Sequence, residues 1–384
     1  MQSIYLDNNA TTAVAQEVFE EMAPYLRELY GNPSSVYSLG AQVRSKIEEA
    51  RVKVAALIGA EADEIVFTSC GTEGNNTAIL SALKTNRQKN HIVTTKVEHP
   101  AVLNLCKLKE SEGYRITYLP VDNDGHLDMN DLKDALDDSV AVVSIMFANN
   151  ETGILFPIQE IGQLLKERNI LFHTDAVQAA GKIPINVRTL SIDMLSISGH
   201  KLHAPKGIGV LYVRRGVPYH PLLIGGHQEN GRRAGTENTA SIIGLGKACE
   251  LAKNNLNSEI AYISGLRDKL QGAILEKCTD SKLNGAKDYR LPNTLNISFQ
   301  YIDGEAVLML LNQHGVCASS GSACSSGSSD ASHVLMAMSV PPEVIRGSVR
   351  FSFSRYNTEA EVNKVIEVLP GIINYLRDIS PFGR

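Results

Sequence analysis

The feature that most limits the fold is the alternation of short β-branched runs with helical patterns between residues 64 and 214. Seven such runs occur: EIVFTS, HIVTT, ITYLPV, VAVVSIMF, ILFHTD, MLSIS and GIGVLYV. Strands that are separated by helices predict a mostly parallel sheet that is covered on both faces. We therefore predict an α/β fold built around a mostly parallel seven-stranded sheet.

Polar clusters follow five of these runs: SCGTEG, EHP, NNETG, DAVQ and GHK. In sheets of this kind, ligands bind in the crevice beyond the carboxyl ends of the strands. We therefore expect five strand ends to converge on one site.

The pattern changes after about residue 255, where longer helical stretches accompany three strand-like segments: TLNISF, GVCASS and SVRFSFS. A chain of 384 residues is also long enough for two domains. We predict a large domain over residues 14–254 and a smaller α+β domain made of residues 1–13 and 255–384. Residues 318–332 are rich in Gly and Ser, which predicts a mobile loop.

Composition narrows the class of protein. The net charge of -5 gives no basic field that would recruit nucleic acid or an anionic membrane. The N-terminus carries no basic-then-apolar signal, and no apolar run is long enough to span a bilayer, so we expect a cytoplasmic protein. None of the six cysteines has C-x-x-C spacing, which argues against a zinc site and leaves a reactive thiol possible in a reducing compartment.

Two residues suggest the chemistry of the site. Asp175 and Lys201 lie at the ends of two predicted strands, at a separation that suits neighbouring parallel strands joined by a helix. A carboxylate for a pyridinium nitrogen and a lysine that forms an imine are the side chains that pyridoxal phosphate most needs from a protein. Taken alone, Asp175 could be a helix N-cap and Lys201 a solvated surface lysine.

Residues 69–74 lie between a strand and a helix. Backbone N–H groups and the Thr72 hydroxyl at a helix N-terminus predict a phosphate site. The segment lacks the Gly-Lys-Ser/Thr ending of a nucleotide-binding loop, and a turn without a ligand is the alternative.

Four further polar residues are candidates. His99 precedes Pro100, which restricts the backbone, so its ring could stack on a cofactor or transfer a proton. Gln178 could reach the cofactor if a helix begins there, and Asn150 could orient a substrate. Arg350 offers a fork for an amino-acid carboxylate, with Arg346 and Arg355 as competitors.

Many segments together resemble a known family. The chain resembles the cysteine desulfurases, fold-type I pyridoxal-phosphate enzymes of the class V aminotransferase family, and most of all their NifS type. The matching segments are YLDNNATT, YGNPSS, FTSCGTEGNNTAIL, TTKVEHPAVL, ANNETG, LFHTDAVQAAGK, SGHKLHAPKGIGVLY, GGHQENGRRAGTENTASIIG, RLPNTLNISF, SSGSACSSGS and VRFSFSRYNTEAEV.

The resemblance implies a role for each residue of the cofactor site. Lys201 holds pyridoxal 5'-phosphate as a Schiff base, and Asp175 pairs with the pyridine nitrogen. Gln178 contacts the phenolic oxygen, and His99 stacks on the ring. The residues that bind the phosphate are Gly71, Thr72, Ser198 and His200, and Asn150 also lies at the cofactor.

It further implies how substrate and sulfur are handled. Asn150 and Arg350 match the substrate carboxylate contacts, and Cys324 matches the cysteine that takes sulfur from L-cysteine, leaving L-alanine. Thr236 matches a position that reaches the phosphate of the partner subunit, which implies a homodimer. Local departures are Tyr37, residues 228–230 and the segment GSSDASHV after the cysteine.

The implied sulfur acceptor is a NifU-like iron-sulfur scaffold, for nitrogen fixation or for general iron-sulfur cluster assembly. Three alternatives stay open. A true class V aminotransferase would use the same lysine and aspartate, and a selenocysteine lyase would use the same chemistry on selenium. A scaffold without catalysis would need a cluster site, which the scattered cysteines do not form.

Overall fold

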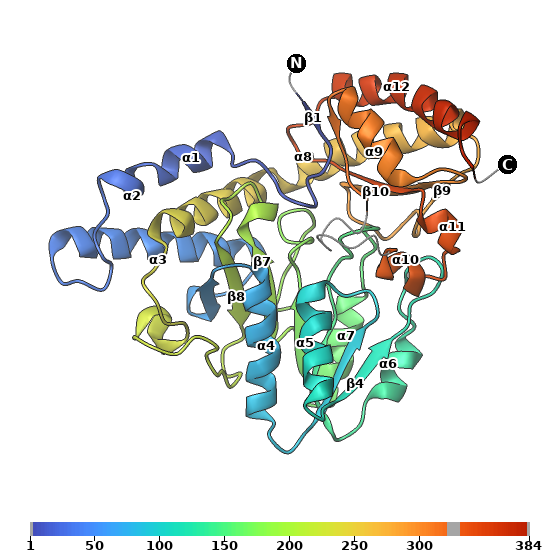
Figure 1. Cartoon of the computed structure of the whole chain (residues 1–384). Coiled ribbons are helices and arrows are strands. Elements are labelled where there is room, and N and C mark those ends of the chain that lie inside the picture. Colours follow the sequence, from blue (N-terminus) through green and yellow to red (C-terminus); the bar gives the residue numbers. More distant parts are fainter. Residues whose placement is uncertain (1–2, 321–330, 382–384) are drawn as a thin grey trace.

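A seven-stranded sheet forms the centre of the protein (Figure 1). The computed structural model describes residues 3–320 and 331–381. The strand order across the sheet is β2-β8-β7-β6-β5-β3-β4. The strands are β2 (Ile65–Thr68), β3 (His91–Thr95), β4 (Arg115–Leu119), β5 (Val140–Ser144), β6 (Leu171–Asp175), β7 (Met194–Ser198) and β8 (Gly209–Val213). Six of the seven predicted runs contain one of them, and the seventh, ITYLPV, overlaps β4, which begins one residue earlier at Arg115.

The sheet is mostly parallel, as predicted. Strands β7, β6, β5, β3 and β4 pair in parallel, and β8 is antiparallel to both of its neighbours, β7 and β2. The central strands are buried along their whole length. Burial on both faces explains why these runs are continuously apolar or β-branched and do not alternate with polar residues.

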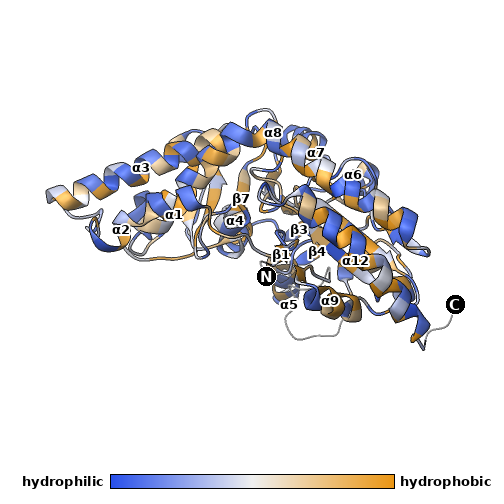
Figure 2. Cartoon of the chain, turned by 90° about the horizontal axis from the view of Figure 1, so that it is seen from above, coloured by the Kyte–Doolittle hydropathy of each residue, from blue (hydrophilic) through white to orange (hydrophobic). Residues whose placement is uncertain are grey.

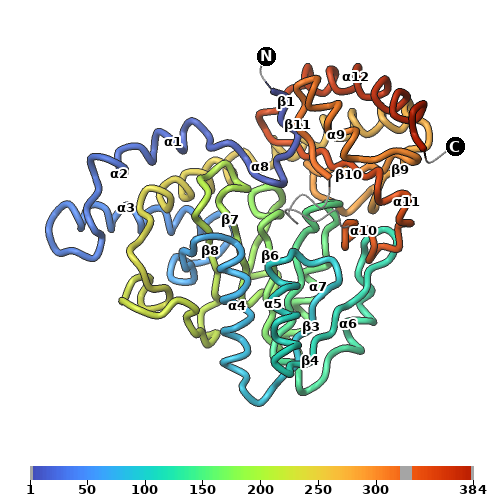
Figure 3. Tube along the Cα trace, in the orientation of Figure 1, coloured from blue at the N-terminus to red at the C-terminus, as the bar shows by residue number. Residues whose placement is uncertain are grey.

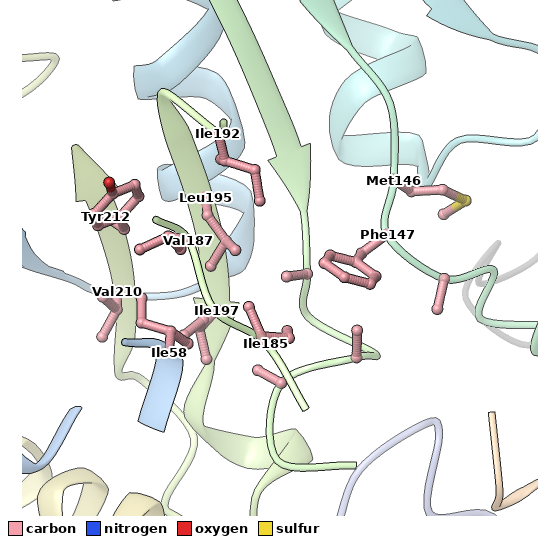
Figure 4. Packing of buried hydrophobic residues seen from close by; sticks show 14 of the residues in the cluster. Ile58, Met146, Phe147, Ile185, Val187, Ile192, Leu195, Ile197, Val210 and Tyr212 are labelled. Carbon is pink, nitrogen blue, oxygen red and sulfur yellow. The ribbon is translucent and has the colours of Figure 1, made fainter. Parts of the chain in front are cut away.

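Helices cover both faces of the sheet. On one face, α4 (Gly71–Thr85) and α5 (Pro100–Ser111) pack on apolar side chains that include Val66, Ile92 and Met194. The other face carries a larger cluster, to which α3 (Ser38–Ile58), α7 (Ile158–Glu167) and the first part of α8 (Thr239–Lys277) contribute. In Figure 4, Ile58 and Ile185 of this larger cluster lie beside Ile197 of β7. The result is a three-layer arrangement.

A second region has its own apolar core. An antiparallel sheet in the order β12-β10-β9 packs against α9 (Gly304–Gln313), α12 (Glu359–Asp378) and the last part of α8. Figure 2 shows hydrophilic and hydrophobic residues interleaved along α12, whose apolar side chains Val362, Val365 and Leu369 are buried. The strands are β9 (Ser281–Leu283), β10 (Thr294–Phe299) and β12 (Ser348–Ser352).

The N-terminal segment belongs spatially to this second region. Strand β1 (Ile4–Tyr5) pairs in parallel with β11 (Val316–Cys317), as Figure 3 shows. Leu6 is part of the second core. The three strand-like segments expected in this part of the chain form β10, β11 and β12. The remaining helices are α1 (Gln16–Met22), α2 (Pro24–Arg27), α6 (Met129–Ala135), α10 (His333–Ala337) and α11 (Pro342–Ile345).

Two sequence-based expectations need comment. The boundary placed between residues 254 and 255 falls inside α8, a helix of 39 residues that contributes to both cores, so the division into two domains stays a prediction. The helix expected between Asp175 and Lys201 is absent: residues 176–193 contain turns, although β6 and β7 are parallel neighbours as expected.

Candidate active site

A cavity of about 730 Å³ lies at the carboxyl ends of the parallel strands. The segments that follow β2, β3, β5, β6 and β7 all contribute to its wall, which confirms the expected convergence of five strand ends. Nine of the candidate residues line it: Gly71, Thr72, His99, Asn150, Asp175, Gln178, Ser198, His200 and Lys201.

Lys201 ends a short 3₁₀ turn, η2 (Gly199–Lys201), that continues directly from β7. The residue is 8% exposed, so it is not the solvated surface lysine of the alternative interpretation. Its Nζ donates hydrogen bonds to the backbone oxygens of Asn9 at 2.5 Å and Ala10 at 2.6 Å. The N-terminal segment therefore holds the amine at the cavity.

Asp175 is the last residue of β6 and is 6% exposed. Its Oδ2 accepts a hydrogen bond from Asn75 Nδ2 at 2.6 Å, and its Oδ1 accepts one from the backbone N–H of Val177 at 3.0 Å. Two donors thus fix the direction of the carboxylate. Asn75 comes from the first turns of α4, so the helix that forms the phosphate candidate also orients the acid.

The N-terminus of α4 opens on the same cavity. Its N-cap, Cys70, makes no side-chain capping hydrogen bond, and the first N–H groups of a helix have no partner within the helix. A Cβ at Gly71 would lie 2.7 Å from Val177 Cγ2, so the bare backbone is what leaves room at this wall. An anion is favoured at such a position by the N–H groups and by the helix dipole.

The two histidines of the cavity are held neutral. His99 caps α5, and its Nδ1 accepts a hydrogen bond from the backbone N–H of Ala101 at 3.1 Å. Burial lowers the pKa of His99, against the opposite effect of Asp175. Burial and the charge of Lys201 lower the pKa of His200 to about 4. His200 can therefore donate only one N–H at neutral pH, because its ring is uncharged.

Gln178 lies in a turn, and no helix begins there, contrary to the condition on which its contact was expected. Its position depends on hydrogen bonds. The side-chain Nε2 donates to the backbone oxygen of Asn9 at 3.1 Å, and Oε1 accepts from Lys182 Nζ at 2.9 Å. The amide is 6% exposed and faces the cavity.

Arg350 is fully buried in β12, does not itself line the cavity, and contacts one of the lining residues, Asn150, from the second region. Its Nη1 donates to the backbone oxygen of Asn150 at 2.9 Å, and its Nη2 donates to Asp7 Oδ1 at 2.8 Å. Within the described part of the chain its Nε has no partner. Of the competitors, Arg355 pairs with Glu259 at 2.6 Å, away from Asn150.

Two candidates lie elsewhere. Thr236 lines a different cavity, next to Ser69 and Arg233, and does not reach the pocket of its own chain. Cys324 and most of the Gly- and Ser-rich stretch lie outside the described residues. Among the described cysteines, Cys70 lines the pocket, and Cys317 in β11 is partly exposed.

Sequence reasoning missed three polar residues at the site. Asn9 supplies the backbone oxygen that Lys201 and Gln178 share, Asn75 orients Asp175, and Lys182 contacts Gln178. Their signals are weak because each is an ordinary polar residue of a turn or helix. Only the fold shows that they meet.

These residues fit pyridoxal 5'-phosphate. The cavity brings together a buried lysine, an oriented carboxylate and a helix N-terminus, which correspond to the imine, the ring nitrogen and the phosphate of that cofactor. Among residues 3–320 and 331–381, no group of His, Cys, Asp and Glu side chains could hold a metal ion. In the same residues no helix has the length and apolar character that crossing a membrane requires.

Comparisons with known proteins agree with this geometry. The family model for aminotransferase class-V matches residues 4–365. "Cysteine desulfurase" of Trichormus azollae is 58% identical over all of this chain and 96% of that protein. "Cysteine desulfurase NifS" of Azotobacter vinelandii is 56% identical over all of this chain and 95% of that protein. A solved structure titled "NIFS-LIKE PROTEIN" is 38% identical, covers 98% of this chain and 100% of its own, and has a TM-score of 0.92.

Proposed function

The chain belongs to the class-V aminotransferase family, among its cysteine desulfurases, and we propose that the cavity around Lys201 is where it removes sulfur from L-cysteine. The enzyme depends on pyridoxal 5'-phosphate and forms L-alanine. The assignment of the site rests on one observation: Lys201, Asp175 and the N-terminus of α4 line the same cavity.

Pyridoxal 5'-phosphate, when bound, supplies an electron sink for the pair left by removal of the Cα proton of an amino acid. Lys201 would attach it through Nζ and, once released by the substrate, would serve as the base at Cα. Asp175 would pair with the ring nitrogen and keep it protonated. Its two hydrogen-bond donors, Asn75 and Val177, hold the carboxylate in one direction for this task.

The phosphate would lie at the N-terminus of α4. Backbone N–H groups and the hydroxyl of Thr72 would be the donors there, together with Ser198, which lies beside Gly71, and His200. His200 contributes as a neutral donor because its pKa is far below neutral. Gln178 would donate its remaining N–H to the phenolic oxygen.

His99 has one ring nitrogen left for catalysis. Its Nδ1 accepts a hydrogen bond from the backbone N–H of Ala101, and its lowered pKa keeps the ring neutral near pH 7, so Nε2 carries the ring proton. We assign to His99 stacking on the ring and donation of a hydrogen bond from Nε2 to the substrate.

Arg350 and Asn150 would bind the substrate carboxylate. Cys324, as a thiolate, would form an S–S bond to the substrate sulfur while the Cβ–S bond of the substrate breaks. The carbon side keeps the electron pair of that bond and is protonated to give L-alanine, and the sulfur remains on Cys324 as a persulfide. A free cysteine has a pKa near ~8.5, so proton removal by the bound substrate complex would raise the thiolate fraction of Cys324.

We further propose a homodimer in which Thr236 reaches the phosphate site of the partner, because Thr236 lies outside the pocket of its own chain. The persulfide would pass to an iron-sulfur scaffold of the NifU type in the cytoplasm, for nitrogen fixation or general cluster assembly. Similarity to the Azotobacter vinelandii protein named NifS supports this proposal.

The test is to add L-cysteine and a thiol reductant to the purified enzyme and to measure sulfide and alanine together. Equal yields are expected. Cys324→Ala should keep the visible absorbance of the cofactor and lose the persulfide, whereas the control Cys317→Ala should form it normally.

Sulfur transfer that survives in Cys324→Ala would refute the role of Cys324 and move it to Cys317 or Cys70. Cofactor absorbance without any sulfide in the wild type would instead favour an aminotransferase, which a screen of amino donors would identify.

A further inference from the structure

Lys182 lies behind the pocket and is not among the residues that line it. Its Nζ donates a hydrogen bond to Gln178 Oε1 at 2.9 Å, and Gln178 Nε2 donates to the backbone oxygen of Asn9 at 3.1 Å. The same Asn9 oxygen accepts from Lys201 Nζ at 2.5 Å. The side-chain amide of Gln178 and the backbone carbonyl of Asn9 therefore connect the amines of Lys182 and Lys201 through hydrogen bonds.

This arrangement fixes the orientation of the Gln178 amide. A lysine ammonium group only donates hydrogen bonds, so the oxygen of the amide must face Lys182. The nitrogen then faces Asn9, and its second N–H is left for the pocket. Without Lys182 the amide oxygen would lose this partner.

We propose that Lys182 is a positioning residue for the cofactor site: it orients the Gln178 amide and places a positive charge beside the amine of Lys201. This inference rests on the proposed role of Lys201. It assigns to Lys182 no contact with substrate.

Burial and neighbouring cations lower the pKa of Lys182. Burial, followed by the positive charges of Lys201 and Arg350, lowers the pKa of Lys182 to about 7. Lys182 also lines a second cavity, together with Lys201, His203, Glu259 and Arg355. The effect is mutual, because two interacting cations each lower the pKa of the other. A charged Lys182 thus favours the unprotonated form of the group at Lys201 Nζ.

The experiment uses the holoenzyme and follows the visible absorbance of the bound cofactor as a function of pH. Lys182→Met should raise the midpoint of the absorbance change by about one pH unit, because a nearby positive charge is removed. It should also weaken the affinity of the apoenzyme for pyridoxal 5'-phosphate about tenfold, because the Gln178 amide loses its orienting partner.

Two conservative variants separate orientation from charge. Lys182→Gln can still donate to Gln178, so it should keep the affinity but shift the midpoint. Lys182→Arg should keep both. The matched control is Lys166→Met, which removes an exposed lysine in the last turn of α7 and should leave both quantities unchanged, because water and salt screen its charge.

A wild-type midpoint in both Lys182→Met and Lys182→Gln would overturn the inference, and folding of each variant is checked by circular dichroism. Lys201→Ala is measured in parallel. If its absorbance loses the pH dependence, the Lys201 assignment stands and the Lys182 variants decide the inference alone. If the pH dependence persists, both the assignment and the inference fail.

Discussion

Replacement of Arg350 by lysine should reduce the use of L-cysteine in a way that the structure allows to be calculated. A guanidinium group carries five N–H donors. Two of them are engaged, with the backbone oxygen of Asn150 at 2.9 Å and with Asp7 Oδ1 at 2.8 Å. Nε has no partner in the described part of the chain, and by the proposed role this atom and the remaining Nη donors would bind a substrate carboxylate.

A lysine ammonium at position 350 has three N–H donors. If two of them replace the contacts to Asn150 and Asp7, one is left for the carboxylate, and a bidentate contact becomes a single hydrogen bond. A hydrogen bond to a charged group contributes about 1.5–3 kcal/mol. Arg350→Lys should therefore lower kcat/KM for L-cysteine about 10- to 150-fold, mostly through KM.

The assay is initial-rate formation of alanine, with the spectral affinity for cysteine methyl ester as the comparison. The ester lacks the carboxylate charge, so its affinity should differ little between the wild type and the variant. The matched control, Arg355→Lys, alters an arginine that pairs with Glu259 and should leave kcat/KM close to that of the wild type. An equal loss of affinity for acid and ester, or a larger loss in Arg355→Lys, would refute the assignment of Arg350 to the carboxylate.

Two further predictions concern stability. The two carboxylate oxygens of Glu229 accept hydrogen bonds from the buried Arg51 at 2.7 and 2.8 Å, so Glu229→Ala should lower the free energy of unfolding, measured by urea titration, by about 3–5 kcal/mol. The double variant Arg51→Met/Glu229→Leu should recover most of this loss, because no buried charge is left unpaired. An equal loss of stability in the double variant would contradict the argument. Burial lowers the pKa of His173 in the folded protein to about 3. The pKa in the unfolded chain is near ~6.5, so the contribution of neutral His173 to stability is complete above that pH and is lost as the pH falls toward 3. The slope of this loss is about 1.4 kcal/mol per pH unit. His173→Asn should therefore show a correspondingly weaker loss of stability between about pH 6 and 4, and an unchanged slope would count against the argument.

The sheet and the location of the pocket were predictable from the sequence. Seven β-branched runs separated by helical patterns specify seven strands, because strands buried on both faces must be apolar along their length. Polar residues directly after those runs, such as Asp175 and Lys201, must then meet where parallel strands end. The family resemblance added expected roles for them, and the roles of Thr236 and Cys324 remain predictions.

Other features could not be obtained from local patterns. The segment between β6 and β7 contains turns in place of the expected helix, and α8 continues across the expected domain boundary. Gln178 is positioned by hydrogen bonds to Lys182 and to the backbone of Asn9, and not by a helix. In each case the outcome depends on contacts between residues far apart in the sequence.

The sequence by itself determined which residues are buried strands and which polar side chains follow them, because periodicity and chain direction act over a few neighbouring residues. Tertiary structure alone decided which donors serve those side chains. Asn9 lies 192 positions from Lys201 and Asn75 lies 100 positions from Asp175, yet each pair forms a buried hydrogen bond. Such contacts form only after the core has packed, because a buried polar group must find its partner wherever the fold has placed one.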